Sequence, residues 1–181
     1  MAHVDEELFH LSRRLREEGE KTLAYLSTLS HDQWEIPVYT EGARWRIRQI
    51  LAHFISTERI YQLYLKDVLR GGRGAPLDLD IDQFNEAEVA KLGSQAVEDL
   101  LKSFRAARVE TLQITGAMDE GDLLKTAVHP WFGERTLGWF LKLIYRHNNL
   151  HLQDVRRAIQ TGDLVSHTNA HRVGRNVNPP K

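Results

Sequence analysis

Apolar residues recur at spacings of three and four through four long segments, and this periodicity constrains the fold more than any other feature. The second segment carries the rhythm in Ile47, Ile50, Phe54, Tyr61 and Leu65. Gly and Pro are scarce and cluster in the connections, at residues 30–44, 71–82, 116–135 and from 162 onward. No segment of any length alternates with the period of two typical of strands. Four helices of roughly 25 residues would each be ~38 Å long, so the sequence predicts an all-α four-helix bundle.

Residues at the segment ends indicate where the helices begin and end. Ser30 and Gln33 fit a capping box, which predicts a short helical turn in the first connection. Thr136 is suited to cap the start of the last helix, and Gly162 to end it in a left-handed conformation. The third connection is long for a bundle. We expect it to contain a short helix at Asp119–Leu124 and to line a pocket.

Length and composition predict one soluble domain. The 181 residues are 41% hydrophobic and 27% charged, with a formal net charge of −1, which gives no field that would attract nucleic acid or an anionic membrane. Residues 1–162 are expected to form the bundle, and residues 163–181 a polar, partly disordered tail. The absence of cysteine excludes disulfides and thiolate metal ligands. Neither a signal peptide nor an apolar run of the ~18 residues needed for a membrane span is found, so a cytoplasmic protein without membrane or nucleic-acid partners is expected.

Two histidines interrupt the apolar stripe of the last segment. His147 and His151 stand between Ile144 and Val155, one helical turn apart, so both side chains project from the inward face. His53 lies on the margin of the stripe in the second segment. A His pair at this spacing can chelate one metal ion. A third His from a facing helix would leave one position open for water, as in catalytic zinc sites. Imidazole suits Zn, Ni, Fe and Cu alike, so the ligand type does not choose the metal.

The same histidines allow a plainer interpretation. Inward imidazoles can hydrogen-bond to one another or to buried carboxylates, and such a core predicts no stabilisation by Zn or Ni. His129, in the third connection, is a candidate for lining a pocket or for acid–base catalysis, although a loop histidine is more often exposed. Glu58 lies about 140° around the helix from His53, and we expect it to pair with an Arg rather than to bind an ion. A further pair at the same spacing, His167 and His171, lies in the polar tail, where no preformed site is expected.

The order of these motifs resembles that of the DinB/YfiT-like proteins. Residues 44–58, RWRIRQILAHFISTE, are similar to a W-x-x-x-x-x-L-x-H-L-x-x-x-E region of that family. Residues 129–153 look like its later segment, in which a G-x-x-T-L start leads into a helix with an H-x-x-x-H motif. The resemblance extends from about Glu6 to Gly162 and implies a four-helix bundle in an up-down-down-up arrangement. It also implies a triad that binds a divalent metal, matched here by His53, His147 and His151.

The resemblance further implies a metal-dependent enzyme. Similar proteins include hydrolase-like members and transferases that use low-molecular-weight thiols, so we expect a small-molecule substrate and a thiol as a candidate cosubstrate. Zn or Ni is the expected metal, with Fe as a further candidate, and a homodimer is the expected assembly. Metal-bound water and His129 are the only candidate catalytic groups. The alternative is a non-catalytic bundle that binds a metal or a small molecule as a sensor or scaffold.

Overall fold

The computed structural model describes residues 5–40, 44–74, 76 and 79–166. Its elements, in chain order, are α1 (Asp5–Leu26), the 3-10 helix η1 (Gln33–Glu35), α2 (Ile47–Leu69), α3 (Ile81–Leu92), α4 (Val97–Gly116), α5 (Glu120–Leu124), β1 (Thr126–His129), β2 (Gly133–Thr136) and α6 (Leu137–Thr161). The protein is therefore mainly helical, as the sequence predicts. None of the helices in the described part of the chain combines the length and apolarity needed to cross a lipid bilayer.

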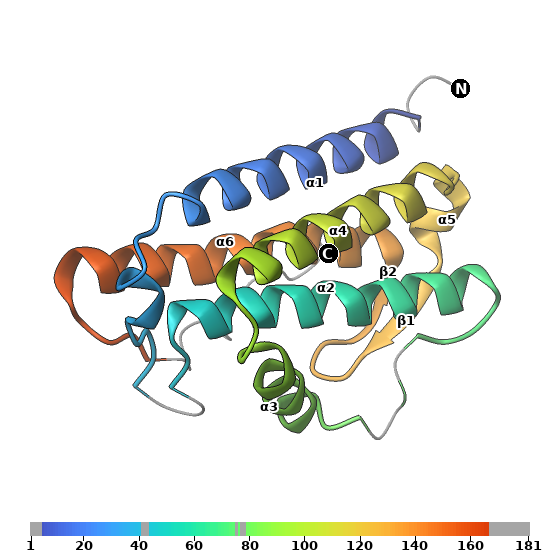
Figure 1. Cartoon of the computed structure of the whole chain (residues 1–181). Coiled ribbons are helices and arrows are strands. Elements are labelled where there is room, and N and C mark those ends of the chain that lie inside the picture. The colour runs from blue at the N-terminus through green and yellow to red at the C-terminus, as the bar shows by residue number, and fades with distance from the viewer. Residues whose placement is uncertain (1–4, 41–43, 75, 77–78, 167–181) are drawn as a thin grey trace.

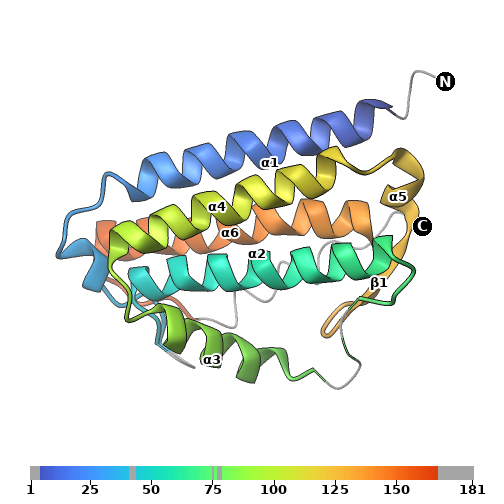
Figure 2. The same ribbon diagram turned by 45° about the vertical axis from the view of Figure 1, so that its right-hand side comes forward.

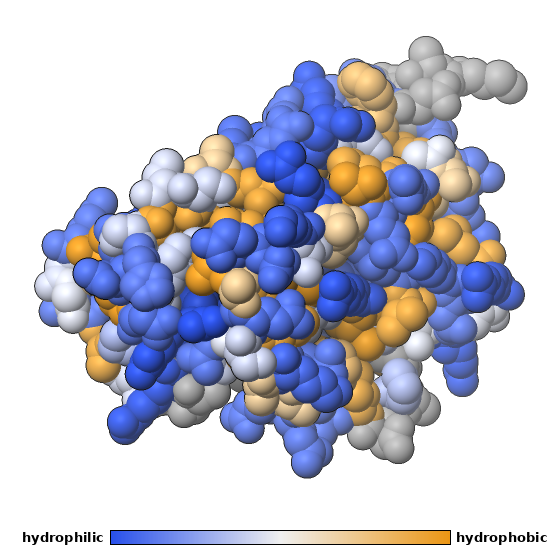
Figure 3. Space-filling view, viewed as in Figure 1, coloured by the Kyte–Doolittle hydropathy of each residue, from blue (hydrophilic) through white to orange (hydrophobic). Residues whose placement is uncertain are grey.

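α1, α2, α4 and α6 are the four long helices of the bundle (Figures 1 and 2). α1 packs against α4 and α6, and α2 packs against the same two helices. In Figure 1, α1 and α6 run from right to left, whereas α2 and α4 run from left to right. The arrangement is thus up-down-down-up, which confirms the topology implied by the family resemblance. The face shown in Figure 3 is largely hydrophilic, with apolar side chains visible between the helices.

Several helix ends lie where the sequence predicts them. The hydroxyl of Thr136 accepts a hydrogen bond from the Trp139 amide (3.2 Å) at the start of α6. Gly162 ends this helix with a φ of 71°, a conformation that favours glycine. The predicted short helix is α5, and Asp119 caps it by accepting from the Asp122 amide (3.0 Å).

The predicted capping box in the first connection is also present. The Ser30 amide donates to Oε1 of Gln33 (2.8 Å), and the Gln33 amide donates to the Ser30 hydroxyl (3.4 Å). These reciprocal contacts precede the single turn of η1. The turn brings the chain from the end of α1 toward the start of α2.

A helix that the sequence analysis did not predict, α3, precedes the third long helix of the bundle. α3 begins after Asp80, whose carboxylate accepts hydrogen bonds from the amides of Asp82 (3.1 Å) and Gln83 (3.0 Å). It ends at Gly93, and α4 starts anew after Ala96. Glycine and the serine that follows it favour a break because both have lower helix propensity than the residues around them. α3 therefore leaves the bundle axis and packs on α2 (Figure 1).

The third connection contains a β-hairpin that the sequence analysis did not predict. β1 and β2 pair antiparallel, from Thr126 opposite Thr136 to His129 opposite Gly133. Gly133 closes the turn with a φ of 69°. Each strand has only four residues, too few for an alternating pattern to stand out. The hairpin leads directly into α6 and so fixes where that helix begins.

The first residues after α6 pack against the bundle. Val165 is buried and forms a parallel bridge with Tyr39 in the connection before α2. This part of the predicted tail is therefore held by backbone pairing with a segment more than a hundred residues away. Residues 167–181, which make up the rest of the predicted tail, lie outside the described residues.

The interior of the bundle contains two apolar clusters. One includes Leu23, Ile50, Phe54 and Phe104, and the other includes Leu15, Tyr61, Tyr64 and Phe140. On every long helix, buried polar residues occupy positions between members of the two clusters. We call this set the polar layer: Glu18, Thr22, Ser56, Thr57, Glu58, Arg108, Thr111, Asn148 and His151.

An ion pair between Glu58 and Arg108 holds one side of the polar layer. Nε and Nη2 of Arg108 donate to the two carboxylate oxygens of Glu58 (2.6 and 3.1 Å), and Nη1 donates to the carbonyl of Leu15 (2.6 Å). The Thr111 hydroxyl also donates to Oε1 of Glu58 (2.8 Å). Both charged side chains are buried. The pair connects α1, α2 and α4, and it confirms the expectation that Glu58 pairs with an Arg.

Replacement of Glu58 by Ala should lower the free energy of unfolding by about 3–5 kcal/mol, because it leaves the Arg108 charge buried without its counter-ion. Urea unfolding of the two proteins measures the difference. The exposed pair of Lys102 with Asp99 on α4 provides a control: Lys102→Ala should change stability by less than about 1 kcal/mol. Equal effects of the two substitutions would contradict this account of the polar layer.

Candidate metal centre

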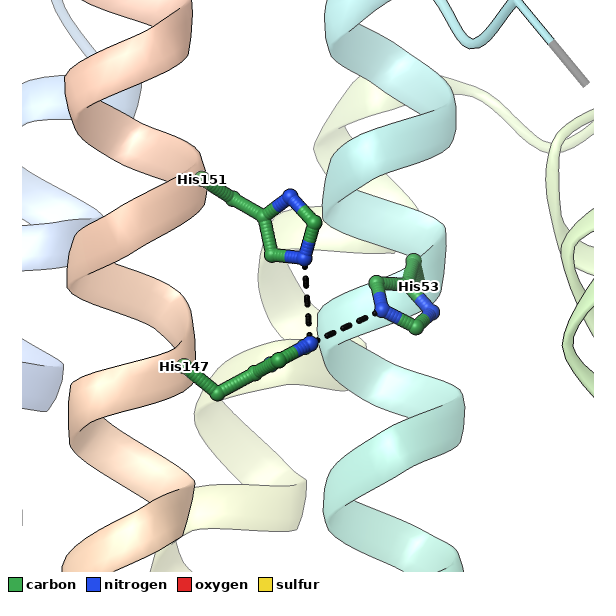
Figure 4. Close-up of side chains that lie close together, drawn as sticks. All are labelled: His53, His147 and His151. Carbon is green, nitrogen blue, oxygen red and sulfur yellow. Dashed lines mark hydrogen bonds between the residues drawn. The ribbon is translucent and has the colours of Figure 1, made fainter. Parts of the chain in front are cut away.

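Three imidazole rings from two helices converge on one point inside the bundle. His53 comes from α2, and His147 and His151 come from adjacent turns of α6 (Figure 4). Nε2 of His147 lies 3.0 Å from Nε2 of His53 and 3.0 Å from Nε2 of His151. The potential ligand atoms of all three residues lie within 4.8 Å of one another. The structure therefore brings together the three histidines that the sequence singled out.

The local sequence explains why the rings meet. His147 and His151 are four residues apart, so their side chains leave the same face of α6. The apolar residues Ile144 and Val155 on either side of them are buried, which turns this face toward the interior. α2 and α6 pack against each other and run in opposite directions, and this places His53 opposite the pair.

Hydrogen bonds alone satisfy this arrangement poorly. A ring nitrogen carries either one proton or one in-plane lone pair. A single proton or lone pair on Nε2 of His147 can serve only one of its two neighbours at a time, although both lie at 3.0 Å. Two nitrogens that each bind one ion at roughly 2.0–2.1 Å can be at most about 4.2 Å apart, and both separations fit. The His group could therefore bind a metal ion, which would accept all three lone pairs.

The other ring nitrogens of two of these histidines contact hydroxyl groups. Nδ1 of His53 lies 3.3 Å from the Thr57 hydroxyl, one turn further along α2. Nδ1 of His151 forms a short contact with the hydroxyl of Tyr39, which in turn donates to Oδ2 of Asp154 (3.2 Å). A histidine that binds a metal through Nε2 commonly donates its Nδ1–H to such a partner. These contacts fit the requirement that a metal ligand be neutral.

Burial differs among the three rings. His53 and His151 are 4% and 3% exposed, whereas His147 is only half-buried. Aromatic side chains cover the buried members: Trp45 packs against His53 with ring centres 4.6 Å apart, and Phe54 lies 5.8 Å from His151. His147 is therefore the most exposed of the three rings.

Comparisons with known proteins agree with this architecture. The sequence profile of the DinB superfamily matches residues 14–155. The chain belongs to the DinB superfamily. Among solved structures, an uncharacterised protein from Escherichia coli UTI89 has a similar fold, with a TM-score of 0.67, 11% sequence identity, and coverage of 87% of this chain and 95% of that protein. No curated protein matches the sequence. Because the two sequences are only 11% identical, the structural similarity shows a shared fold and nothing about function.

This DinB superfamily member carries a further buried histidine outside the group. His129 is 1% exposed at the end of β1, so the expectation that a histidine in this connection is exposed is wrong. Its Nδ1 accepts a hydrogen bond from the Trp131 amide (3.1 Å), and its Nε2 lies 3.0 Å from the Tyr61 hydroxyl. Because Nδ1 accepts, the neutral ring carries its proton on Nε2 and donates it to the oxygen of Tyr61. Both ring nitrogens are thus engaged: Nδ1 within the turn of the hairpin, and Nε2 in a contact that joins the hairpin to α2.

Tyr39, Thr57 and Asp154 are the residues at this centre that sequence reasoning missed. Asp154 carries a detectable signal, because it follows His151 by three positions and shares its side of α6. Thr57 likewise lies four residues after His53 on α2. Tyr39 gives no such signal, because it lies in a non-helical connection, where its distance in sequence from His151 does not indicate a contact. The predicted tail histidines, His167 and His171, lie outside the described residues.

We expect His129 to make this DinB superfamily member less stable in acid. Burial first, and then the positive charges of His147 and Arg135, lower the pKa of His129 to about 3. The unfolded chain has a His pKa of about 6.5 and binds a proton below that pH, whereas the folded protein does not. The free energy of unfolding should therefore fall with pH by up to about 1.4 kcal/mol per unit through this residue, or about 2 kcal/mol between roughly pH 6.5 and 5.

Urea unfolding of the wild type and of His129→Gln, both with chelator present, measures this contribution. The variant should lose less stability than the wild type as the pH is lowered, even if it is less stable at every pH. Parallel stability curves for the two proteins would show that His129 binds protons equally well in the folded and unfolded chain.

Proposed function

We propose that this protein is a divalent-metal-dependent enzyme whose ion is held by Nε2 of His53, His147 and His151. The convergence of the three rings carries the proposal: Nε2 of His147 lies 3.0 Å from Nε2 of each of the other two, and the ligand atoms of all three lie within 4.8 Å of one another. Within the described residues, this is the one group of at least three His, Asp or Glu side chains that is arranged to hold an ion. An all-imidazole donor set is compatible with Zn, Ni and Fe, and the resemblance to the family makes Zn or Ni the metal that we propose.

The openness of the group supports catalysis rather than a purely structural ion. Structural zinc sites usually have four protein ligands, whereas catalytic sites keep a position for water or substrate. Here three ligands are brought together, and His147 is the most exposed of them, so we propose that a small molecule approaches from its side. A metal bound here would supply Lewis acidity and lower the pKa of water or of a thiol ligand. We therefore propose a hydrolase or a transferase that uses a low-molecular-weight thiol.

The protein's own residues have three roles in this proposal. The histidines bind and orient the ion, and Trp45 and Phe54 exclude water from the inner side of the rings. The Thr57 hydroxyl accepts a hydrogen bond from Nδ1–H of His53. This contact leaves the lone pair of the ring on Nε2, where it can bind the ion. His129 was a candidate acid–base residue, but its contacts with Trp131 and Tyr61 favour an anchoring role.

The proposal predicts about one divalent ion per chain in protein purified without a His-tag. His53→Ala and His151→Ala should each lose the ion, because two remaining imidazoles bind a metal far more weakly than three. Elemental analysis after gel filtration measures the content. His10→Ala is a matched control, because His10 is an exposed histidine on α1. Unchanged metal content in both His53→Ala and His151→Ala would refute the site.

Binding should also stabilise the fold. An ion that binds only the folded chain adds about 2.7 kcal/mol at a free concentration of 100 times its dissociation constant. Thermal unfolding with Zn²⁺ or Ni²⁺, compared with chelator, tests this. No stabilisation of the wild type would support a packed core of hydrogen-bonded imidazoles instead.

Catalysis requires a separate test. The metal-loaded wild type and His147→Ala should be screened against ester, amide and thiol-transfer substrates. Turnover in the wild type that is lost in the variant would support an enzyme. A protein that binds the ion but turns over none of these substrates would favour the alternative of a non-catalytic metal-binding bundle.

A further inference from the structure

We infer that Tyr39 and Asp154 are positioning residues that set the ring tautomer of His151 and so prepare it to bind the metal. This inference rests on the proposed metal site. It concerns a chain of contacts that links three segments: the connection before α2, the middle of α6 and the residues that follow α6.

The direction of each hydrogen bond determines where the proton of His151 lies. The Tyr39 hydroxyl donates its single proton to Oδ2 of Asp154 (3.2 Å). Toward Nδ1 of His151 the phenol oxygen can therefore only accept, and Nδ1 must carry the proton. A neutral imidazole with Nδ1–H has its lone pair on Nε2, and this is the nitrogen that faces His147 and His53. The carboxylate thus selects, through the phenol, the tautomer that can ligate an ion.

Without Asp154 the same phenol would have the opposite effect. A phenol is a good donor, and a tyrosine with no carboxylate acceptor can turn its proton toward Nδ1 of His151. His151 would then carry its own proton on Nε2, where it blocks the lone pair. Tyr39 alone is therefore compatible with either tautomer of His151, and Asp154 selects the one with its proton on Nδ1.

Backbone pairing holds Tyr39 in place for this role. The Val165 amide donates to the carbonyl of Val38 (2.8 Å), and the Thr40 amide donates to the carbonyl of Val165 (3.0 Å). On the other side, the Val38 amide donates to the carbonyl of Trp45 (2.9 Å). Tyr39 is itself 1% exposed. The phenol is thus fixed between the segment after α6 and the start of α2.

The same connection contacts both ligand-bearing helices. Tyr39 reaches His151 on α6, while Trp45 packs against His53 on α2. His53 has its Nδ1 partner, Thr57, on its own helix, four residues further along the chain. His151 depends on a residue 112 positions away in sequence. The Nδ1 contact of His151 therefore forms only when distant segments of the chain have packed together, whereas the Nδ1 contact of His53 lies within one helix.

The first measurement needs no metal. Ring nitrogen chemical shifts of ¹⁵N-histidine-labelled, metal-free protein report the tautomer of each histidine. The full-length wild type should show His151 with its proton on Nδ1. Asp154→Ala should move the proton to Nε2, whereas Asp154→Asn, which keeps an oxygen that accepts from Tyr39, should retain it on Nδ1. A wild-type His151 with its proton on Nε2, or the same tautomer in Asp154→Ala as in the wild type, would overturn the inference.

The second measurement is the affinity for Co²⁺, followed by the visible spectrum of the bound ion. Tyr39→Phe and Asp154→Ala should each raise the dissociation constant by roughly 10–100-fold, the usual effect of losing an outer partner of a ligand, and Asp154→Asn should largely restore it. Tyr64→Phe is the control, because Tyr64 is a buried tyrosine of the same bundle whose hydroxyl has no hydrogen-bond partner among the described residues. Its affinity and spectrum should match the wild type.

The outcomes separate this inference from the proposed function. If His151→Ala binds Co²⁺ as tightly as the wild type, the metal site itself is wrong. If His151→Ala loses Co²⁺ while Tyr39→Phe and Asp154→Ala bind it like Tyr64→Phe, the site stands and the positioning role is refuted. Circular dichroism of each variant shows whether it is folded, and the wild-type tautomer decides the question if a variant is not.

Discussion

The whole centre depends on one limit of imidazole chemistry: each ring nitrogen offers either a proton or a lone pair, never both. Nε2 of His147 faces two other ring nitrogens at 3.0 Å, so no set of protons satisfies both contacts together. A shared cation would resolve the conflict, provided that every Nδ1 carried the proton. The outer hydroxyls of Thr57 and Tyr39 are therefore as much a part of the centre as the rings they contact.

The polar layer explains how a helical bundle tolerates such a centre. Buried polar groups cost free energy unless they are paired, and here they share one zone between two apolar clusters. On one side of that zone, Glu58 and Arg108 satisfy each other and tie α1, α2 and α4 together. On the other side, the histidines join α2 to α6. The two apolar clusters contain few buried polar groups, so the free-energy cost of burying polar side chains is confined to the zone between them.

Local signals in the sequence were sufficient for the bundle, the capped ends of α6 and the three histidines, because each depends on residues within a few turns of one helix. Signals failed where the outcome depends on long-range packing. The helix α3 was missed because its 12 residues are too few to stand out as a fifth long segment, and the hairpin strands are too short to show a period. Val165 and Tyr39 pair across more than a hundred residues, and nothing near either one in the sequence indicates the other.

Because the polar layer is divided in this way, we expect the bundle to fold without a bound ion. All three histidines come from α2 and α6, so a bound ion would cross-link only these two helices. α1 and α4 contact the rest of the bundle through apolar residues, the Glu58–Arg108 pair and further polar contacts such as Asn149 with Glu18, none of which involves the three histidines. Unlike a zinc finger, whose small core cannot form without its metal, this bundle has enough buried apolar surface to hold its ligands in position beforehand. An ion bound by the three histidines would therefore meet ligands that the fold already holds close together.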